Sequence, residues 1–248
     1  MLGTRLVVVS DAHFGASSAE LDQSFLRFLE RVPSLGDCLL INGDLYDFWF
    51  SYRRVIPRTG FAVTAALAAL RRKVPIVMTG GNHDRWGDSF WQKELEIPYS
   101  PGETTFTIGS TRVLALHGDG VAEEHRSAKI MHRITSHPLA TWLYRAVHPD
   151  VGIWLVDRMS RHLADCTRDP AVLDRAQTRQ ADWARARLEA DPSIGLLIMS
   201  HTHRPTLAEL LPGRRYLNPG AWIEGRRFAV VTESSVQLEV FDDESVTA

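Results

Sequence analysis

The chain is poor in cysteine, in clustered charge and in long apolar runs. Among its 248 residues only Cys38 and Cys166 are cysteines, and neither belongs to a Cys-x-x-Cys pair. So few cysteines exclude a disulfide-stapled scaffold and indicate a reducing compartment. The formal net charge is -2, without a long run of one sign, which argues against a basic nucleic-acid-binding platform.

No window of the sequence approaches the roughly 18 consecutive apolar residues that a membrane span requires. The N-terminus has no signal-peptide pattern, because the apolar run from Leu6 to Val9 is too short for the hydrophobic region of a signal. We therefore expect a cytoplasmic protein, which can still contact the inner membrane peripherally.

The first structural pattern is a series of short apolar runs separated by helical segments. Each run is rich in Val, Ile or Leu, as in a sheet that is covered on both faces. Segments 18–31 and 60–73 have the apolar spacing or the alanine and leucine content of helices. Strands that alternate with helices indicate an α/β core. The predicted strands are 6–10, 38–42, 75–79, 112–116 and 196–200.

A second pattern appears later in the chain. Segments 104–108, 215–217, 228–232 and 236–241 resemble short strands joined by tight turns, and they predict a second, partly antiparallel sheet. The intervening stretch to about residue 191 is almost entirely helical in pattern. We interpret its first part, about 121–167, as a helical cap inserted into a single domain of residues 1–248.

Residue types that bind metals follow the predicted strands directly. Ligand sites in α/β sheets form outside the carboxyl ends of the strands, so five separate segments bring Asp, Asn and His to one edge. The segments are Asp11-Ala12-His13, Gly43-Asp44-Leu45-Tyr46-Asp47, Gly81-Asn82-His83-Asp84, His117-Gly118-Asp119 and His201-Thr202-His203.

The spacing within these segments suits metal binding. Side chains alternate along a strand, so Asp11 and His13 point the same way, and His201 and His203 can converge likewise. A set of carboxylate, amide and imidazole ligands suits Mn, Fe or Zn better than an all-oxygen Mg or Ca cage. Seven such side chains are too many for one tetrahedral ion and suffice for two ions that share a carboxylate.

Each segment alone has an ordinary explanation. An isolated Asp-x-His is more often a polar pair in a loop, and Gly-Asp after a strand is usually a turn. Five such segments, each at the end of a predicted strand, favour a metal site over these separate explanations.

Together the five segments resemble the motifs of the calcineurin-like metallophosphoesterase superfamily, over residues 11–203. The resemblance implies an α/β/β/α sandwich of two sheets that hydrolyses a phosphoester with two divalent metal ions. We expect manganese, and iron, zinc and nickel are accepted by the same ligand set.

The resemblance also implies a role for each side chain. One metal would be held by Asp11, His13 and His203, the other by Asn82, His117 and His201, with Asp44 bridging the two. His83 would lie near the leaving-group oxygen and act in catalysis, oriented by Asp84.

Details outside the five motifs narrow the substrate. Protein serine/threonine phosphatases have Gly-Asp-x-x-Asp-Arg-Gly and Gly-Asn-His-Glu, whereas here Phe48 follows Asp47 and the third motif ends in Asp84. The chain instead resembles the UDP-2,3-diacylglucosamine pyrophosphatases of lipid A biosynthesis, which release UMP and a lipid sugar phosphate and carry a helical insertion after His-Gly-Asp. His83 departs from that branch, in which arginine often stands at this position. The similar runs are 43–49, 117–120, 148–150, 200–205 and 218–222.

Two regions are candidates for substrate recognition. The cap combines apolar residues, arginines and histidines, which fits either a helical hairpin packed on itself or an acyl-chain groove with a basic rim. The arginines that follow Trp49 are either solvated or bind phosphate. The substrate-binding candidates are Arg53, Arg54, Arg85, Asp119 and Arg126.

Three alternatives to a nucleotide-lipid pyrophosphatase stay open: a phosphodiesterase for another nucleotide or small soluble phosphodiester, a nuclease, and an inactive scaffold. The slightly acidic net charge counts against a nuclease, and the complete set of ligand residues counts against a scaffold. We expect a small-molecule phosphoester as substrate, no nucleic-acid partner, and peripheral membrane contact through the cap if the substrate is a lipid nucleotide.

Overall fold

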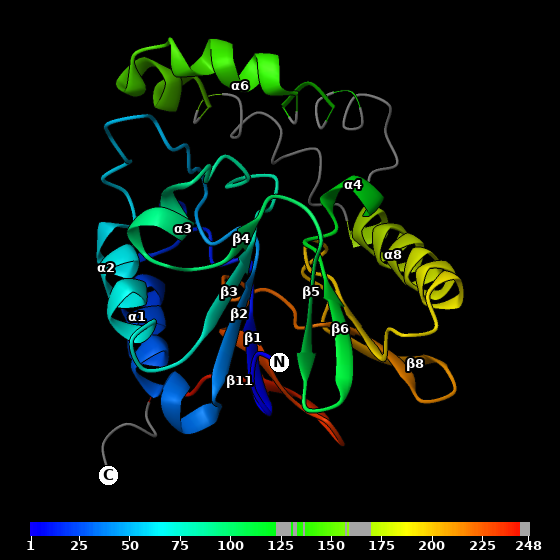
Figure 1. The fold of residues 1–248 in the computed structure, drawn as a ribbon. Coiled ribbons are helices and arrows are strands. Elements are labelled where there is room, and N and C mark those ends of the chain that lie inside the picture. The colour runs from blue at the N-terminus through cyan, green and yellow to red at the C-terminus, as the bar shows by residue number, and fades with distance from the viewer. Residues whose placement is uncertain (123–129, 131–132, 136, 157, 159–169, 244–248) are drawn as a thin grey trace.

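The computed structural model describes residues 1–122, 130, 133–135, 137–156, 158 and 170–243. Two β-sheets pack against each other, and helices cover the outer face of each sheet (Figure 1). The expected α/β/β/α sandwich is therefore confirmed.

Within the described residues the first sheet has six strands, in the order β11-β10-β1-β2-β3-β4. The last four of these run parallel, whereas β10 and β11 are antiparallel to their neighbours. The strands are β1 (Arg5–Val9), β2 (Cys38–Asn42), β3 (Ile76–Thr79), β4 (Tyr99–Ser100), β10 (Arg227–Thr232) and β11 (Val236–Val240).

The expectation that segments 228–232 and 236–241 belong to the second sheet is wrong. β10 pairs with β1, with Leu6 opposite Val231, and β11 pairs with β10. Apolar alternation predicts that these segments are strands, but the choice of partner depends on where the preceding turn carries the chain. That turn is fixed to the end of β1, because the Trp222 amide donates to the Ser10 carbonyl at 3.0 Å.

The second sheet has five strands among the described residues, in the order β5-β6-β7-β9-β8. Its three central strands are parallel, and β5 and β8 run antiparallel at the edges. The sequence pattern did not predict β8, β4 or the short helix α3 (Phe90–Glu94), because β8 has no buried residue and β4 and α3 are only two and five residues long. The strands are β5 (Thr104–Ile108), β6 (Thr111–Ala115), β7 (Leu196–Ile198), β8 (Thr206–Leu211) and β9 (Arg214–Asn218).

The central strands are apolar on both faces because each face lies in a different core. In β1, Val7 and Val9 point toward the helices, whereas Leu6 and Val8 point toward the second sheet. Between the sheets, the side chains opposite include Ile198 of β7. This alternation explains the continuous apolar runs in the sequence.

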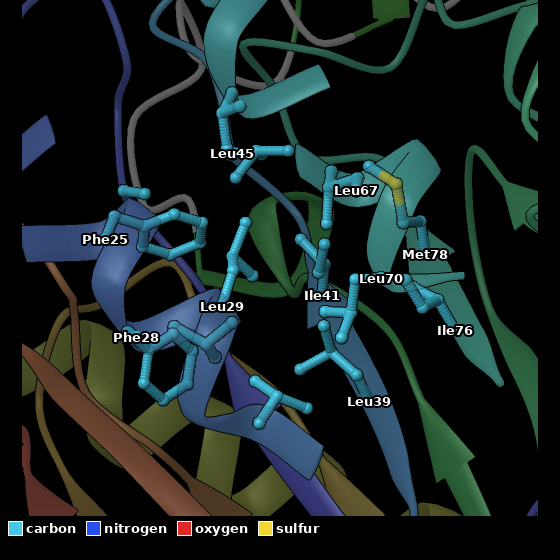
Figure 2. Close-up of a cluster of buried hydrophobic side chains, with 14 of the residues drawn as sticks. Phe25, Phe28, Leu29, Leu39, Ile41, Leu45, Leu67, Leu70, Ile76 and Met78 are labelled. Atoms are coloured by element: carbon cyan, nitrogen blue, oxygen red, sulfur yellow. The ribbon is translucent and has the colours of Figure 1, made fainter. Parts of the chain in front are cut away.

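The helices α1 (Ala19–Leu35) and α2 (Phe61–Leu70) cover the first sheet. Figure 2 shows Phe25 and Leu29 of α1 and Leu67 of α2 directed toward Ile41 and its neighbours in the sheet. Helix α1 begins where the sequence predicts it, because the Ser18 hydroxyl caps it by accepting from the Leu21 amide at 3.2 Å.

The second sheet is covered by α8 (Pro170–Ala190), which buries Ala184 and Leu188 against Leu197 and Tyr216. The chain between β6 and α8 is described only in part, by α4 (Asp119–Ala122), α6 (Pro138–Arg145) and helical residues 149–156. Much of the expected cap at 121–167, Arg126 and Cys166 included, lies outside the described residues. Figure 1 shows α6 beyond one end of the sheets.

Side chains tie α6 to the loops at this end of the sandwich. The Tyr144 ring lies 4.7 Å from the Phe50 ring between centroids, and Arg145 forms an ion pair with Asp88 at 2.9 Å. Just before α6, the Thr135 carbonyl accepts from the Trp86 indole at 3.0 Å. Among the described helices none is long and apolar enough to cross a bilayer.

Candidate active site

The carboxyl ends of strands from both sheets meet at one place. Asn42, the last residue of β2, donates to the Leu116 carbonyl at 3.0 Å and to the Ser200 hydroxyl at 2.8 Å. Leu116 directly follows β6, and Ser200 lies two residues after the end of β7, both in the second sheet. The predicted ligand segments therefore meet where the two sheets adjoin, and not at the edge of a single sheet.

The structure brings the predicted ligand residues together at this junction. Three groups have ligand atoms that lie within 4.8 Å of one another, and Asp44 and His13 each belong to two groups. Asp44 Oδ2 lies 3.0 Å from His117 Nε2, and Asp11 Oδ1 lies 3.3 Å from His203 Nε2. The groups are Asp11, His13 and His203; His13, Asp44 and His83; and Asp44, His117 and His201.

Several of these ligand atoms are buried without a hydrogen-bond partner in the described part of the chain. They include both carboxylate oxygens of Asp11, Nε2 of His13 and Oδ1 of Asn82. Buried polar atoms in native proteins nearly always have a partner, so such a cluster fits bound cations. The donor set of carboxylate, amide oxygen and imidazole suits a divalent transition metal.

Two histidines are oriented by hydrogen bonds on the far side of the ring. His117 Nδ1 donates to the Asn42 carbonyl at 2.9 Å, and His203 Nδ1 lies 2.8 Å from Glu224 Oε1. These contacts leave each Nε2 free to face the cluster, as in most histidine metal ligands. The sequence motifs gave no indication of Glu224, because it approaches His203 only through the fold.

The cluster has a strongly negative potential. Burial opposes charge on His203, but the Asp11 carboxylate raises the pKa of His203 to about 10. Likewise, against the effect of burial, Asp44 raises the pKa of His117 well above its usual value. Burial and the neighbouring His117 lower the pKa of His201 to about 4. The Asp11 and Asp44 carboxylates thus favour positive charge on His203 and His117, as they would favour a bound cation, whereas His201 stays neutral.

Five of the predicted ligand residues have a left-handed backbone. A non-glycine residue in this region costs on the order of 1–3 kcal/mol, and such strain concentrates at functional sites. The strand ends turn sharply here and aim both side chains of each Asp-x-His or His-x-His pair at the junction. The residues are Asp11, His13, Asp44, His201 and His203, with φ of 52°, 49°, 51°, 70° and 57°.

Gly43 is required by the same turn. Its φ is 82°, and a Cβ at this position would overlap the His117 ring. We expect Gly43→Ala to destabilise the protein by roughly 1–3 kcal/mol and to lower its cation content, since the clash displaces His117. Denaturant unfolding and metal analysis would measure both effects.

Gly102→Ala is the matched control, because no heavy atom lies within 4 Å of the added Cβ. Its unfolding free energy should change by less than about 0.5 kcal/mol. Equal stability of the two variants would contradict the packing argument for Gly43.

His83 borders the cluster, but its orientation differs from the expected one. Its Nδ1 donates to the Asp47 carbonyl at 2.7 Å. The Asp84 carboxylate instead accepts from the backbone amides of Gly81 at 2.8 Å and Leu45 at 2.7 Å. The expectation that Asp84 orients His83 is therefore wrong. Asp84 joins the two ligand loops, and burial and Asp44 raise the pKa of Asp84 to about 6.

The substrate-binding candidates occupy different surroundings. Arg85 forms a buried ion pair with Asp119, two residues after His117, so this pair lies beside the cluster. Arg53 and Arg54 are exposed in the loop between β2 and α2. A cavity of about 90 Å³ near the cluster is lined by Phe14, Gly15, Asp47, Phe48, Pro57, Thr59 and Ile153.

Known proteins resemble this chain over nearly its full length. A protein of Porphyromonas gingivalis named UDP-2,3-diacylglucosamine hydrolase is 28% identical over 261 residues, covering 97% of this chain and 98% of its own. One of the same name from Shewanella baltica is 23% identical, covering 98% and 100%. Among solved structures, the Escherichia coli phosphoesterase Yfce has a TM-score of 0.47 and 17% identity, covering 98% of this chain and 97% of its own.

The family described as calcineurin-like phosphoesterase matches residues 4–205. This span includes every strand end that carries a predicted metal ligand. The resemblance inferred from the five motifs is thus confirmed, and with it a hydrolase that depends on divalent metal. The chain belongs to the calcineurin-like phosphoesterase family.

Proposed function

We propose that the protein hydrolyses the diphosphate bond of UDP-2,3-diacylglucosamine or a close analogue, giving UMP and a lipid sugar phosphate. The observation that carries the phosphoester chemistry is the cluster of unpartnered ligand atoms at the junction of the sheets. Support for the substrate comes from the relatives, which bear that name and align over 97% and 98% of this chain.

We assign Asp11, His13 and His203 to one cation, Asn82, His117 and His201 to the other, and Asp44 to both. Two of the three observed groups support this division, because Asp11, His13 and His203 form one and Asp44, His117 and His201 form another. We propose manganese, with iron, zinc or nickel as substitutes. When bound, two divalent cations supply Lewis acidity that activates a water molecule and neutralises the charge of the phosphate.

The surrounding side chains position the substrate and move a proton. His83 donates a proton or hydrogen bond to the leaving oxygen from the side of the ring that does not bind Asp47. Arg85, held by Asp119, contacts a phosphate oxygen beside the cluster. We assign exposed Arg53 and Arg54, and Arg126, which lies outside the described residues, to substrate binding.

We also propose that residues of about 121–167 form a cap, inserted in a single domain, that binds the acyl chains. On α6, Leu139, Trp142 and Leu143 are 57%, 61% and 54% exposed, and Tyr144 of the same helix packs against Phe48, the residue after Asp47. The same surface would contact the cytoplasmic face of the inner membrane, where a diacylated substrate resides.

The test compares kcat/KM for UDP-2,3-diacylglucosamine and for an aryl phosphodiester, with Mn²⁺ added. Trp142→Ala should lower kcat/KM for the lipid nucleotide by roughly 10-fold or more and leave the aryl diester unchanged, because remote binding energy is lost only for the lipid. Phe61→Ala is the control, since Phe61 is 66% exposed on α2.

Hydrolysis of the aryl diester without any hydrolysis of the lipid nucleotide would overturn the proposed substrate. It would instead favour a phosphodiesterase for a smaller soluble compound. Equal losses on both substrates in Trp142→Ala would contradict the role of α6.

A further inference from the structure

The carboxylate of Glu224, outside the residues matched by the family, contacts a histidine of the candidate metal site. Glu224 Oε1 lies 2.8 Å from Nδ1 of His203, and Nε2 of the same ring lies 3.3 Å from Asp11 Oδ1. The family match ends at residue 205, so none of the five motifs includes Glu224. The imidazole therefore connects this carboxylate directly to the Asp11, His13 and His203 group.

The turn that carries Glu224 is fixed to the strand end that carries Asp11. The Ile223 amide donates to the Asp11 carbonyl at 3.1 Å, and the Arg226 amide donates to the Trp222 carbonyl at 2.7 Å. Trp222 itself is 1% exposed and packs edge-on against Phe25 at 5.0 Å between ring centroids. The backbone at Glu224 is thus fixed by the core, whereas its side chain is 52% exposed and is held by the contact with His203.

The two ends of the cluster differ in how their histidines are held. At the inner end, His117 is 1% exposed and its Nδ1 donates to a backbone carbonyl, that of Asn42. At the outer end, His203 is 22% exposed and its Nδ1 meets the carboxylate of Glu224. A carboxylate oxygen that accepts the proton on Nδ1 fixes the tautomer and the orientation of an imidazole ligand.

We propose that Glu224 is a positioning residue that orients His203 with its proton on Nδ1 and thereby strengthens cation binding by the Asp11, His13 and His203 group alone. Removal of the Glu224 carboxylate frees the His203 ring to rotate and to carry the proton on Nε2, the atom that must bind the cation. The proposal rests on the ligand assignment of the proposed function, but not on the identity of the substrate.

The experiment titrates metal-stripped protein with Mn²⁺ and follows binding by calorimetry and electron paramagnetic resonance. Glu224→Ala is expected to weaken one of the two binding events by roughly 10–100-fold and to leave the other unchanged. Glu224→Gln should retain most of the affinity, since its amide oxygen still accepts from Nδ1. Glu20→Ala is the control, because Glu20 is a nearby exposed carboxylate that pairs with Arg226 instead.

Unchanged binding in Glu224→Ala, or equal weakening of both events, would overturn the proposal. Equal losses in Glu224→Gln and Glu224→Ala would also overturn it, because charge rather than orientation would then matter. These outcomes are separate from the substrate assay. A wild-type protein that binds Mn²⁺ but does not hydrolyse the lipid nucleotide would contradict the proposed function and leave the role of Glu224 intact.

Discussion

Replacement of Asp44 by alanine is expected to abolish hydrolysis of lipid nucleotide and aryl diester alike. Asp44 is the carboxylate that belongs to both the His13 and the His117 groups, so neither cation would be held correctly without it. Lewis acidity contributes several kcal/mol to phosphoester hydrolysis, which corresponds to a loss of roughly 10³-fold or more in kcat. The Asp44 carboxylate also accepts from the His83 amide at 2.9 Å, so alanine disturbs the neighbouring loop as well.

Asp44→Asn separates the loss of charge from the loss of structure. Asparagine tolerates the left-handed backbone at this position, where φ is 51°, and its carbonyl oxygen still accepts from the His83 amide. We expect Asp44→Asn to fold, to bind fewer than two equivalents of Mn²⁺ and to lose activity nearly as severely. Glu30→Ala, which removes an exposed carboxylate on α1, is the control. Two tightly bound cations in Asp44→Asn would contradict the bridging role.

The sequence predicts the core strands and the ligand residues for the same physical reason. Strands buried on both faces must be continuously apolar, so a polar residue directly after such a run marks a strand end. The apolar runs that end at Val9, Ile41 and Leu116 follow this rule, with the ligands Asp11, Asp44 and His117 one to three residues beyond them, and the structure brings these ligands together. A local pattern sufficed because each ligand is determined by its own strand.

What the sequence could not predict depends on contacts between distant segments. The pairing of β10 with β1 is such a contact, and so is the approach of Glu224 to His203. The Asp84 carboxylate is a third case, because its backbone partners become visible only when the loops after β2 and β3 lie side by side. No periodicity or short motif records a hydrogen bond between residues far apart in the chain.

Replacement of His83 by alanine is expected to lower kcat by roughly 10²–10⁴-fold while both cations stay bound, the range for loss of a positioned acid. With Nδ1 bound to the Asp47 carbonyl, Nε2 remains available for the leaving oxygen. Burial opposes the charged ring, but the Asp44 and Asp47 carboxylates raise the pKa of His83 above its usual value. Proton donation needs the charged ring, so the wild-type rate should fall as pH rises through the pKa of His83 in the cation-loaded enzyme. The variant should lack that decline.

A comparison of two leaving groups distinguishes more sharply between His83 as a proton donor and His83 as a metal ligand. A nitrophenyl ester leaves without protonation, so His83→Ala should impair it far less than an alkyl ester, whose oxygen needs a proton. Calorimetric titration with Mn²⁺ completes the comparison, because His83 also lies within ligand distance of His13 and Asp44. If His83→Ala lost a cation and impaired both esters equally, His83 would be a metal ligand, and its role as the proton donor would be refuted.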